Sequence, residues 1–210
     1  MVEDAPLDPA ASAALIAEQR AKVEAAMDVD ARVLFGAWGV AWLVGFTVLW
    51  LRDLEPPVLR MSQQAGMMVF AALLFAAGAV TAGHLTVKGR GLRGASARQG
   101  AMYGWSWSLS FAVVWALAFA LARAGASDEV IGVAMMITSL LVVGALYMAG
   151  GALWEERIQW ALGAWICVAT IAAALVGLPH MYLVMAVGGG GGLLAGAVAD
   201  GVRRRGPRMV

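Results

Sequence analysis

The chain has 210 residues, of which 61% are hydrophobic and only 14% are charged. Soluble domains carry roughly a quarter charged residues, and a soluble protein with this composition would expose large apolar patches. The net charge of +1 also argues against nucleic acid as a partner. The composition therefore excludes an ordinary soluble domain and indicates an integral membrane protein in contact with a lipid bilayer.

The first predicted element is a helix over about residues 9–29, within an N-terminal segment 1–32. Asp8 can cap this helix, and Pro9 suits its first position. Leu15 and Val23 belong to a thin apolar face among many alanines, and the charges on the other faces are balanced. A position on the membrane surface and docking onto the protein's own cytoplasmic loops both agree with this pattern.

Stretches without charged residues then divide the chain into candidate crossings. A helix needs about 20 apolar residues to cross the hydrocarbon core, and four such stretches lie between Arg32 and Glu155. The uncharged stretch from Arg157 to Asp200 is too long for one helix and should fold back at the turn 177–180. The sequence therefore predicts an all-α fold, a bundle of six transmembrane helices in three hairpins. The predicted spans are 33–51, 65–86, 101–122, 130–151, 158–176 and 181–199.

The distribution of basic residues predicts the orientation of the bundle. Segments 1–32, 87–100, 151–157 and 200–210 carry twelve Lys and Arg residues, and the loops on the opposite side carry three. Lys and Arg concentrate on the cytoplasmic side of membrane proteins. We therefore expect both termini, including the basic tail 200–210, in the cytoplasm. The excess of Arg over Lys suggests a high-GC bacterial genome, so the expected location is a bacterial cytoplasmic membrane.

Five consecutive glycines lie inside the sixth span: Gly188, Gly189, Gly190, Gly191 and Gly192. Each costs up to about 1 kcal/mol in a helix interior relative to alanine. The spacing of Gly188, Gly192 and Gly196 favours close packing of a neighbouring backbone. Alternatively, the run is an unwound stretch whose free carbonyls and amides line a substrate or ion site, as in transporters with broken helices.

Six polar side chains are expected in the cytoplasmic halves of the second to fourth spans. They are Thr81, His84, Tyr103, Ser106, Ser110 and Tyr147. Together with the glycine run, they would form a candidate substrate-binding vestibule open to the cytoplasm. The alternative is that the hydroxyl groups bond to their own helix backbones and the tyrosines anchor the helices at the interface.

The sequence lacks the residues that several kinds of function require. No Asp, Glu, Lys or Arg is expected in the middle of a span, which argues against an ion-driven pump. His84 and His180 are expected near opposite membrane faces, so they cannot share one metal ion. No zinc-protease, hydrolase or P-loop motif occurs. We therefore expect no metal, no cofactor and no catalytic residues, and an enzyme is poorly supported.

Three stretches of sequence carry a resemblance to a known family: 34–42 (LFGAWGVAW), 101–107 (AMYGWSW) and 179–185 (PHMYLVM). They resemble a family of six-helix integral membrane proteins from high-GC actinobacteria that are loosely labelled as transporters. The resemblance covers nearly the whole chain after residue 12 and implies no particular site residues. The layout of six spans after a cytoplasmic helix is also similar to the permease subunits of ABC-2-type exporters.

Two functions agree with these features. The first is a transport-related role, as a small permease or the membrane subunit of an exporter. The second is a non-transporting interaction or regulatory subunit that uses the N-terminal helix and the basic inner loops as docking surfaces. Either role leaves open a partner subunit on the cytoplasmic side, such as an ATPase or a regulator, and a homo-oligomer.

Overall fold

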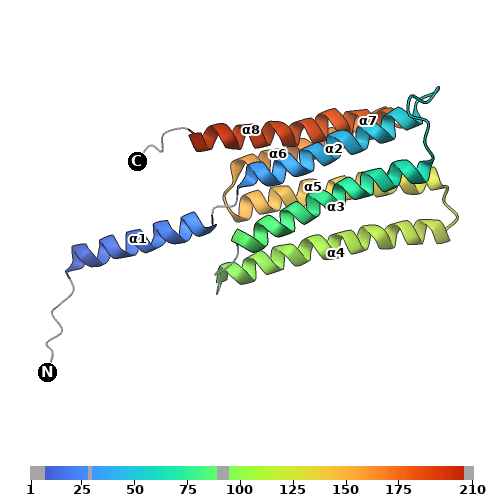
Figure 1. Cartoon of the computed structure of the whole chain (residues 1–210). Helices are drawn as coiled ribbons and strands as arrows, with labels where there is room; N and C mark the ends of the chain where they lie inside the picture. The colour runs from blue at the N-terminus through green and yellow to red at the C-terminus, as the bar shows by residue number, and fades with distance from the viewer. Residues whose placement is uncertain (1–7, 28–29, 89–94, 206–210) are drawn as a thin grey trace.

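The computed structural model describes residues 8–27, 30–88 and 95–205, and the regular structure in these ranges is entirely helical. Helix α1 (Pro9–Met27) precedes a bundle of long helices and projects beyond its end (Figure 1). Leu15 and Ile16 on α1 are 58% and 55% exposed. The all-α fold class with a short N-terminal helix is therefore confirmed.

Within residues 30–88 and 95–205, the bundle contains six helices that are long and apolar enough to cross a membrane. Each contains the corresponding predicted span, and the last is divided into three segments. Their bounds are α2 Ala31–Asp53, α3 Gln63–Lys88, α4 Ala95–Arg123, α5 Asp128–Leu153 and α6 Arg157–Val176, followed by α7 His180–Val184, the π-helix η1 Met185–Gly190 and α8 Gly191–Arg205. The chain is thus a multi-pass membrane protein.

Local sequence explains where these helices begin and end. The side chain of Ser127 caps α5 by accepting a hydrogen bond from the Val130 N–H at 3.3 Å. Helix α6 ends at Val176, and Gly177 follows with a φ of 76°, in the left-handed region that glycine enters at little cost. Since α7 begins at His180, the predicted turn between the fifth and sixth crossings is present.

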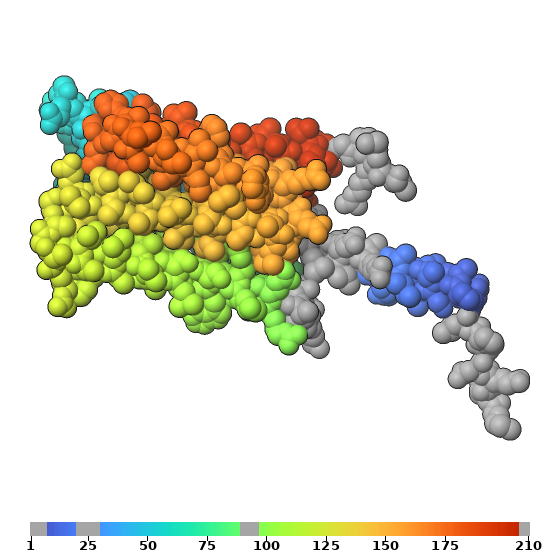
Figure 2. All heavy atoms as spheres, turned by 180° about the vertical axis from the view of Figure 1, so that it is seen from behind, coloured from blue at the N-terminus to red at the C-terminus, as the bar shows by residue number. Residues whose placement is uncertain are grey.

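The helices pack side by side in the order α3, α2, α8, α6, α5, α4. Figure 2 shows one face of this arrangement, on which α4, α5 and α6 are neighbours (green, yellow and orange). The last crossing lies between α2 and α6 and supplies much of the core, which includes Ile166, Met181, Met185 and Leu193, each at most 1% exposed. The glycine-rich segment therefore lies in the best-packed part of the molecule.

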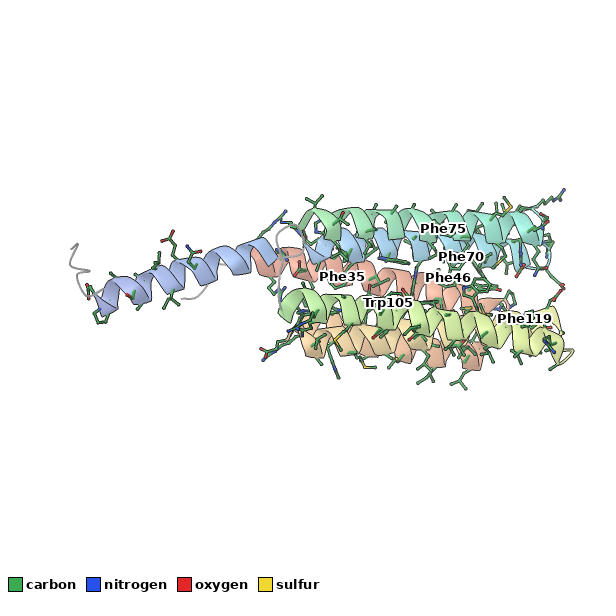
Figure 3. All side chains as sticks on the ribbon, turned by 90° about the horizontal axis from the view of Figure 1, so that it is seen from below. Phe35, Phe46, Phe70, Phe75, Trp105 and Phe119 are labelled. Carbon is green, nitrogen blue, oxygen red and sulfur yellow. The ribbon has the colours of Figure 1, made fainter. Side chains whose placement is uncertain are left out.

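The two outermost helices, α3 and α4, each pack mainly against one neighbour. Phe70 on α3 contacts Phe46 on α2, with ring centroids 4.7 Å apart, whereas Phe75 on the same helix is 80% exposed (Figure 3). Trp105 and Phe119 on α4 are 66% and 65% exposed. Apolar faces of this kind suit lipid as a solvent, because acyl chains are as apolar as the side chains.

We call the end of the bundle that carries the start of α2 and the end of α8 the termini end. The start of α4, the end of α5 and the start of α6 also lie there, because successive crossings run in opposite directions (Figure 1). The opposite end, with the Gly177 turn, is the far end.

Candidate functional site

A pocket of about 390 Å³ opens at the termini end, beside the first turns of α4 and the last turn of α5. The residues that line it are Arg98, Gln99, Met102, Tyr103, Ser106 and Leu153. Five of the six belong to one face of α4, at helical spacing. The pocket combines a guanidinium, an amide and two hydroxyl groups with the apolar side chains of Met102 and Leu153.

Tyr103 is held firmly in the wall of this pocket. Its hydroxyl donates a hydrogen bond to the Leu146 carbonyl at 2.6 Å and lies 3.5 Å from Nε2 of Gln159. The Trp154 ring packs edge-on against the tyrosine ring, with centroids 4.8 Å apart. A Cβ atom on Gly150 would lie 2.5 Å from the Tyr103 hydroxyl oxygen, so only glycine leaves room for it. Three helices, α4, α5 and α6, therefore position this phenol.

Ser106 is the second predicted site residue in the pocket. Its hydroxyl donates to the carbonyl of Met102 at 3.0 Å, one turn earlier in the same helix. Ser108 makes the equivalent bond to Gly104 at 3.4 Å but does not line the pocket. The expected alternative, in which serines bond to their own helix backbone, thus describes both residues, and only Ser106 also faces the pocket.

Thr81 and His84, in contrast, serve the contact between α3 and α2. The Trp38 indole N–H donates to the Thr81 hydroxyl at 2.9 Å. The Asp30 backbone N–H donates to Nε2 of His84 at 3.2 Å, which fixes the start of α2 against α3. Neither residue lines the pocket beside α4.

Tyr147 and Ser110 lie deeper in the bundle. The Tyr147 ring packs against Phe35 and Trp107, with centroids 6.0 Å and 6.1 Å away. Ser110 is partly buried on α4 and does not line the pocket. The structure thus brings Tyr103 and Ser106 together in one pocket and places the other four polar residues elsewhere.

The five glycines form a continuous helix that includes one π-helical segment. Gly188–Gly190 belong to η1 and Gly191–Gly192 begin α8, and none of them has a positive φ. The indole N–H of Trp165 donates to the Gly188 carbonyl at 2.8 Å. A Cβ atom on Gly190 would lie 2.5 Å from the Leu43 backbone nitrogen of α2. The observed geometry is that of close packing, and the Gly188 carbonyl accepts its hydrogen bond from Trp165.

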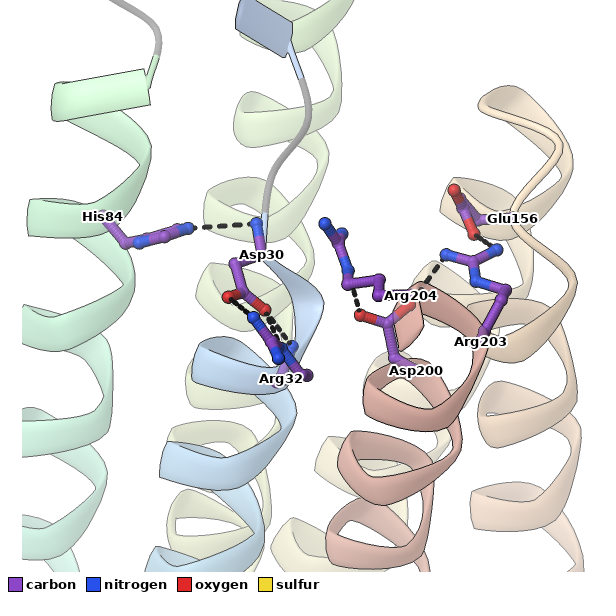
Figure 4. Close-up of polar contacts among 7 residues, drawn as sticks. All are labelled: Asp30, Arg32, His84, Glu156, Asp200, Arg203 and Arg204. Carbon is purple, nitrogen blue, oxygen red and sulfur yellow. Dashed lines mark hydrogen bonds and ion pairs between the residues drawn. The ribbon is translucent and has the colours of Figure 1, made fainter. Parts of the chain in front are cut away.

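A network of ion pairs at the termini end was missed by the sequence analysis (Figure 4). The Asp200 side chain on α8 is only 1% exposed and accepts hydrogen bonds from Arg203 and Arg204, both at 2.7 Å. Arg203 also pairs with Glu156, just before α6, at 2.9 Å. The network therefore ties the last crossing to α6. Its signal in the sequence is the spacing of Asp200 three and four residues before two arginines.

A second ion pair caps the start of α2. The Asp30 carboxylate accepts hydrogen bonds from the Arg32 side chain at 2.8 Å and 2.6 Å and from its backbone N–H at 3.1 Å. The hydrogen bonds from the Arg32 side chain lower the pKa of Asp30 to about 2. This carboxylate therefore stays ionised at any physiological pH and holds the first crossing in place.

Metal chemistry finds no support in the described residues 8–27, 30–88 and 95–205, which contain no group of three His, Cys, Asp or Glu side chains able to hold an ion. His84 lies near the termini end of α3, and His180 lies at the far end, at the start of α7. The two histidines are therefore separated along the bundle, as the sequence predicts.

The fold and the pocket together define a class of protein, a multi-pass membrane protein with six candidate crossings in the described residues and, at one end, a largely apolar pocket that carries a few polar groups. No protein-family model, no curated protein and no solved structure matches this chain.

Proposed function

We propose that this protein is a transport-related membrane protein, a small permease or the membrane subunit of an exporter, that takes up amphipathic cargo at the pocket beside α4. The termini end then faces the cytoplasm, because the segments there carry most of the Lys and Arg residues. The resemblance to the six-helix actinobacterial family supports the same role and a bacterial cytoplasmic membrane.

The single observation that carries this proposal is the composition of the pocket. Arg98, Gln99, Tyr103 and Ser106 offer polar groups, and Met102 and Leu153 offer apolar contact, around a volume of about 390 Å³. Ligand pockets commonly combine apolar walls with a few well-placed polar groups. Tyr103 is fixed by hydrogen bonds to two other helices, so its position is established before any cargo arrives.

Filling the pocket should stop transport. In membrane vesicles that carry the full-length chain, we expect Ser106→Trp to reduce the export of fluorescent amphiphiles, neutral Nile red and an anionic NBD-labelled fatty acid, by about tenfold or more, because the indole occupies space that cargo needs. The matched control is Ser108→Trp, since Ser108 is also exposed on α4 but lies outside the pocket.

Two results would contradict this proposal. One is that vesicles with the wild-type chain export neither amphiphile faster than vesicles without it. The other is that Ser106→Trp and Ser108→Trp reduce export equally while both proteins insert in normal amounts, because the pocket would then have no special role.

A second candidate is a non-transporting interaction or regulatory subunit, and α1 favours it. This helix projects beyond the bundle with Leu15 and Ile16 more than half exposed, as a docking helix would (Figure 1). Deleting residues 1–29 should then abolish co-purification of a cytoplasmic ATPase or regulator without changing membrane insertion. Equal recovery of that partner with the full-length and the shortened chain would argue against this role.

A further inference from the structure

Arg98 lies at the edge of the pocket, and its guanidinium is the positive charge of this site. Among the residues that the structure describes, no carboxylate pairs with it. Arg32 at the start of α2, and Arg203 and Arg204 at the end of α8, in contrast bind carboxylates. The guanidinium of Arg98 is therefore free to bind an anion that enters the pocket.

The surroundings of Arg98 favour negative charge as well. Arg98 lies in the first turn of α4, where the unpaired N–H groups of a helix create a partial positive charge, and this turn contains no acidic residue. The side-chain amide of Gln99 lines the same pocket and can donate hydrogen bonds to an oxyanion, whereas the hydroxyl groups of Tyr103 and Ser106 already donate to backbone carbonyls. The polar part of the pocket thus suits the anionic head of a ligand.

An apolar ridge continues from the pocket along the surface of α4. Met102, Trp105, Leu109 and Val113 are 71%, 66%, 61% and 68% exposed, and their spacing places them on one face of the helix. From Met102 to Val113 the ridge extends about 16 Å at 1.5 Å per residue, roughly half of the ~30 Å hydrocarbon core. This length matches an acyl chain that lies in one leaflet.

We propose that the pocket and the ridge form one site for an anionic amphiphile, with a phosphate or carboxylate head on Arg98 and an acyl tail along α4. An anionic phospholipid is the ligand that this geometry fits best. The inference rests on the proposed function, because it assigns a ligand class to the same pocket. It follows from the combination of a guanidinium that pairs with no carboxylate in the described part of the chain, the neighbouring amide of Gln99 and an adjoining apolar ridge.

Binding of three probes to the full-length protein in a neutral detergent tests this site, by native mass spectrometry. We expect phosphatidylglycerol to bind more tightly than phosphatidylcholine, and glycerol phosphate, which has the head chemistry without tails, to show no specific binding. Arg98→Gln should weaken phosphatidylglycerol binding by about tenfold, because a charge-assisted bond to the head is lost. Since Arg98 pairs with no described carboxylate, thermal stability should stay unchanged.

Arg157→Gln is the matched control, because Arg157 is also an exposed arginine at the termini end but does not line the pocket. It should change phosphatidylglycerol affinity less than twofold. Equal losses in the two variants would overturn the inference and indicate general attraction to basic residues. Tight binding of glycerol phosphate would also overturn it, since the ridge would then contribute nothing.

The result for the lipid site can be distinguished from the result for the proposed transport function. If Arg98→Gln weakens lipid binding but vesicles show no export, the site stands and the transport role fails. If export depends on Ser106 while phosphatidylglycerol and phosphatidylcholine bind equally, the transport role stands and the anionic ligand class is wrong.

Discussion

Replacing Gly190 by alanine should destabilise the bundle more than any other exchange of a single glycine in the run Gly188–Gly192. A Cβ atom at this position would lie 2.5 Å from the Leu43 nitrogen, 2.8 Å from the Leu43 Cα and 3.0 Å from the Gly39 carbonyl oxygen. All three atoms belong to the backbone of α2, so no side-chain rotation relieves the contact. Overpacking of this kind costs typically about 1–3 kcal/mol, and we expect a loss at the upper end of this range.

Gly191→Ala is the matched control for this experiment. It is the next residue in the chain, and its added Cβ would meet no atom within 4 Å. Alanine at an unobstructed helical position is favoured over glycine by roughly 0.5–1 kcal/mol, so this variant should be slightly stabilised. Thermal unfolding in detergent, followed by circular dichroism, compares the two variants. Similar unfolding temperatures for both would mean that the last crossing does not pack closely on α2.

The number and position of the crossings could be predicted because charge is a direct signal of membrane boundaries. Arg32 and Arg52, for example, lie near the two ends of α2, and no charged residue lies between them. The turn at Gly177 could be predicted because the uncharged stretch around it was too long for one helix. These inferences need only the thickness of a bilayer and the rise of a helix, and no knowledge of which helices touch.

The candidate site was predicted only in part. Helical spacing indicates on which face of its helix a residue lies, but not which other helix packs against that face. Thr81 and Tyr103 have similar depths in their spans, yet Thr81 bonds to Trp38 on α2 and Tyr103 to Leu146 on α5. The packing order of the helices separates them. In the sequence, Arg98 served only to predict which end of the bundle faces the cytoplasm. Its place in a pocket depends on how α4 lies against α5.

The π-helix could not be predicted from the glycine run for a related reason. Glycine is compatible with a broken helix, a π-helix and a close helix contact, so the sequence leaves all three open. The contacts of this segment with Leu43 on α2 and Trp165 on α6 favour the closely packed π-helix. Both contacts depend on the relative register of helices that are far apart in the sequence.

Replacing Asp200 by asparagine should produce the second large effect, because its carboxylate is the buried centre of the ion-pair network. The side chain is 1% exposed and binds two arginines, of which Arg203 is 48% and Arg204 23% exposed. Removing one partner of a fully buried ion pair costs about 3–5 kcal/mol. Water still reaches both arginines here, so we expect a smaller loss of about 1–3 kcal/mol in the free energy of unfolding.

Glu156→Gln is the control, since Glu156 binds the same Arg203 through an exposed pair, at 44% and 48% exposure. Exposed pairs contribute about 0–1 kcal/mol and weaken as salt screens them. Thermal unfolding at low and high salt should therefore show a large, salt-insensitive loss for Asp200→Asn and a small, salt-sensitive loss for Glu156→Gln. Equal losses would mean that burial of Asp200 adds nothing. A dominant loss for Asp200→Asn would instead show that the ion pairs within the last turns of α8 contribute more than the exposed pair to Glu156 before α6, at the end where the proposed cargo enters.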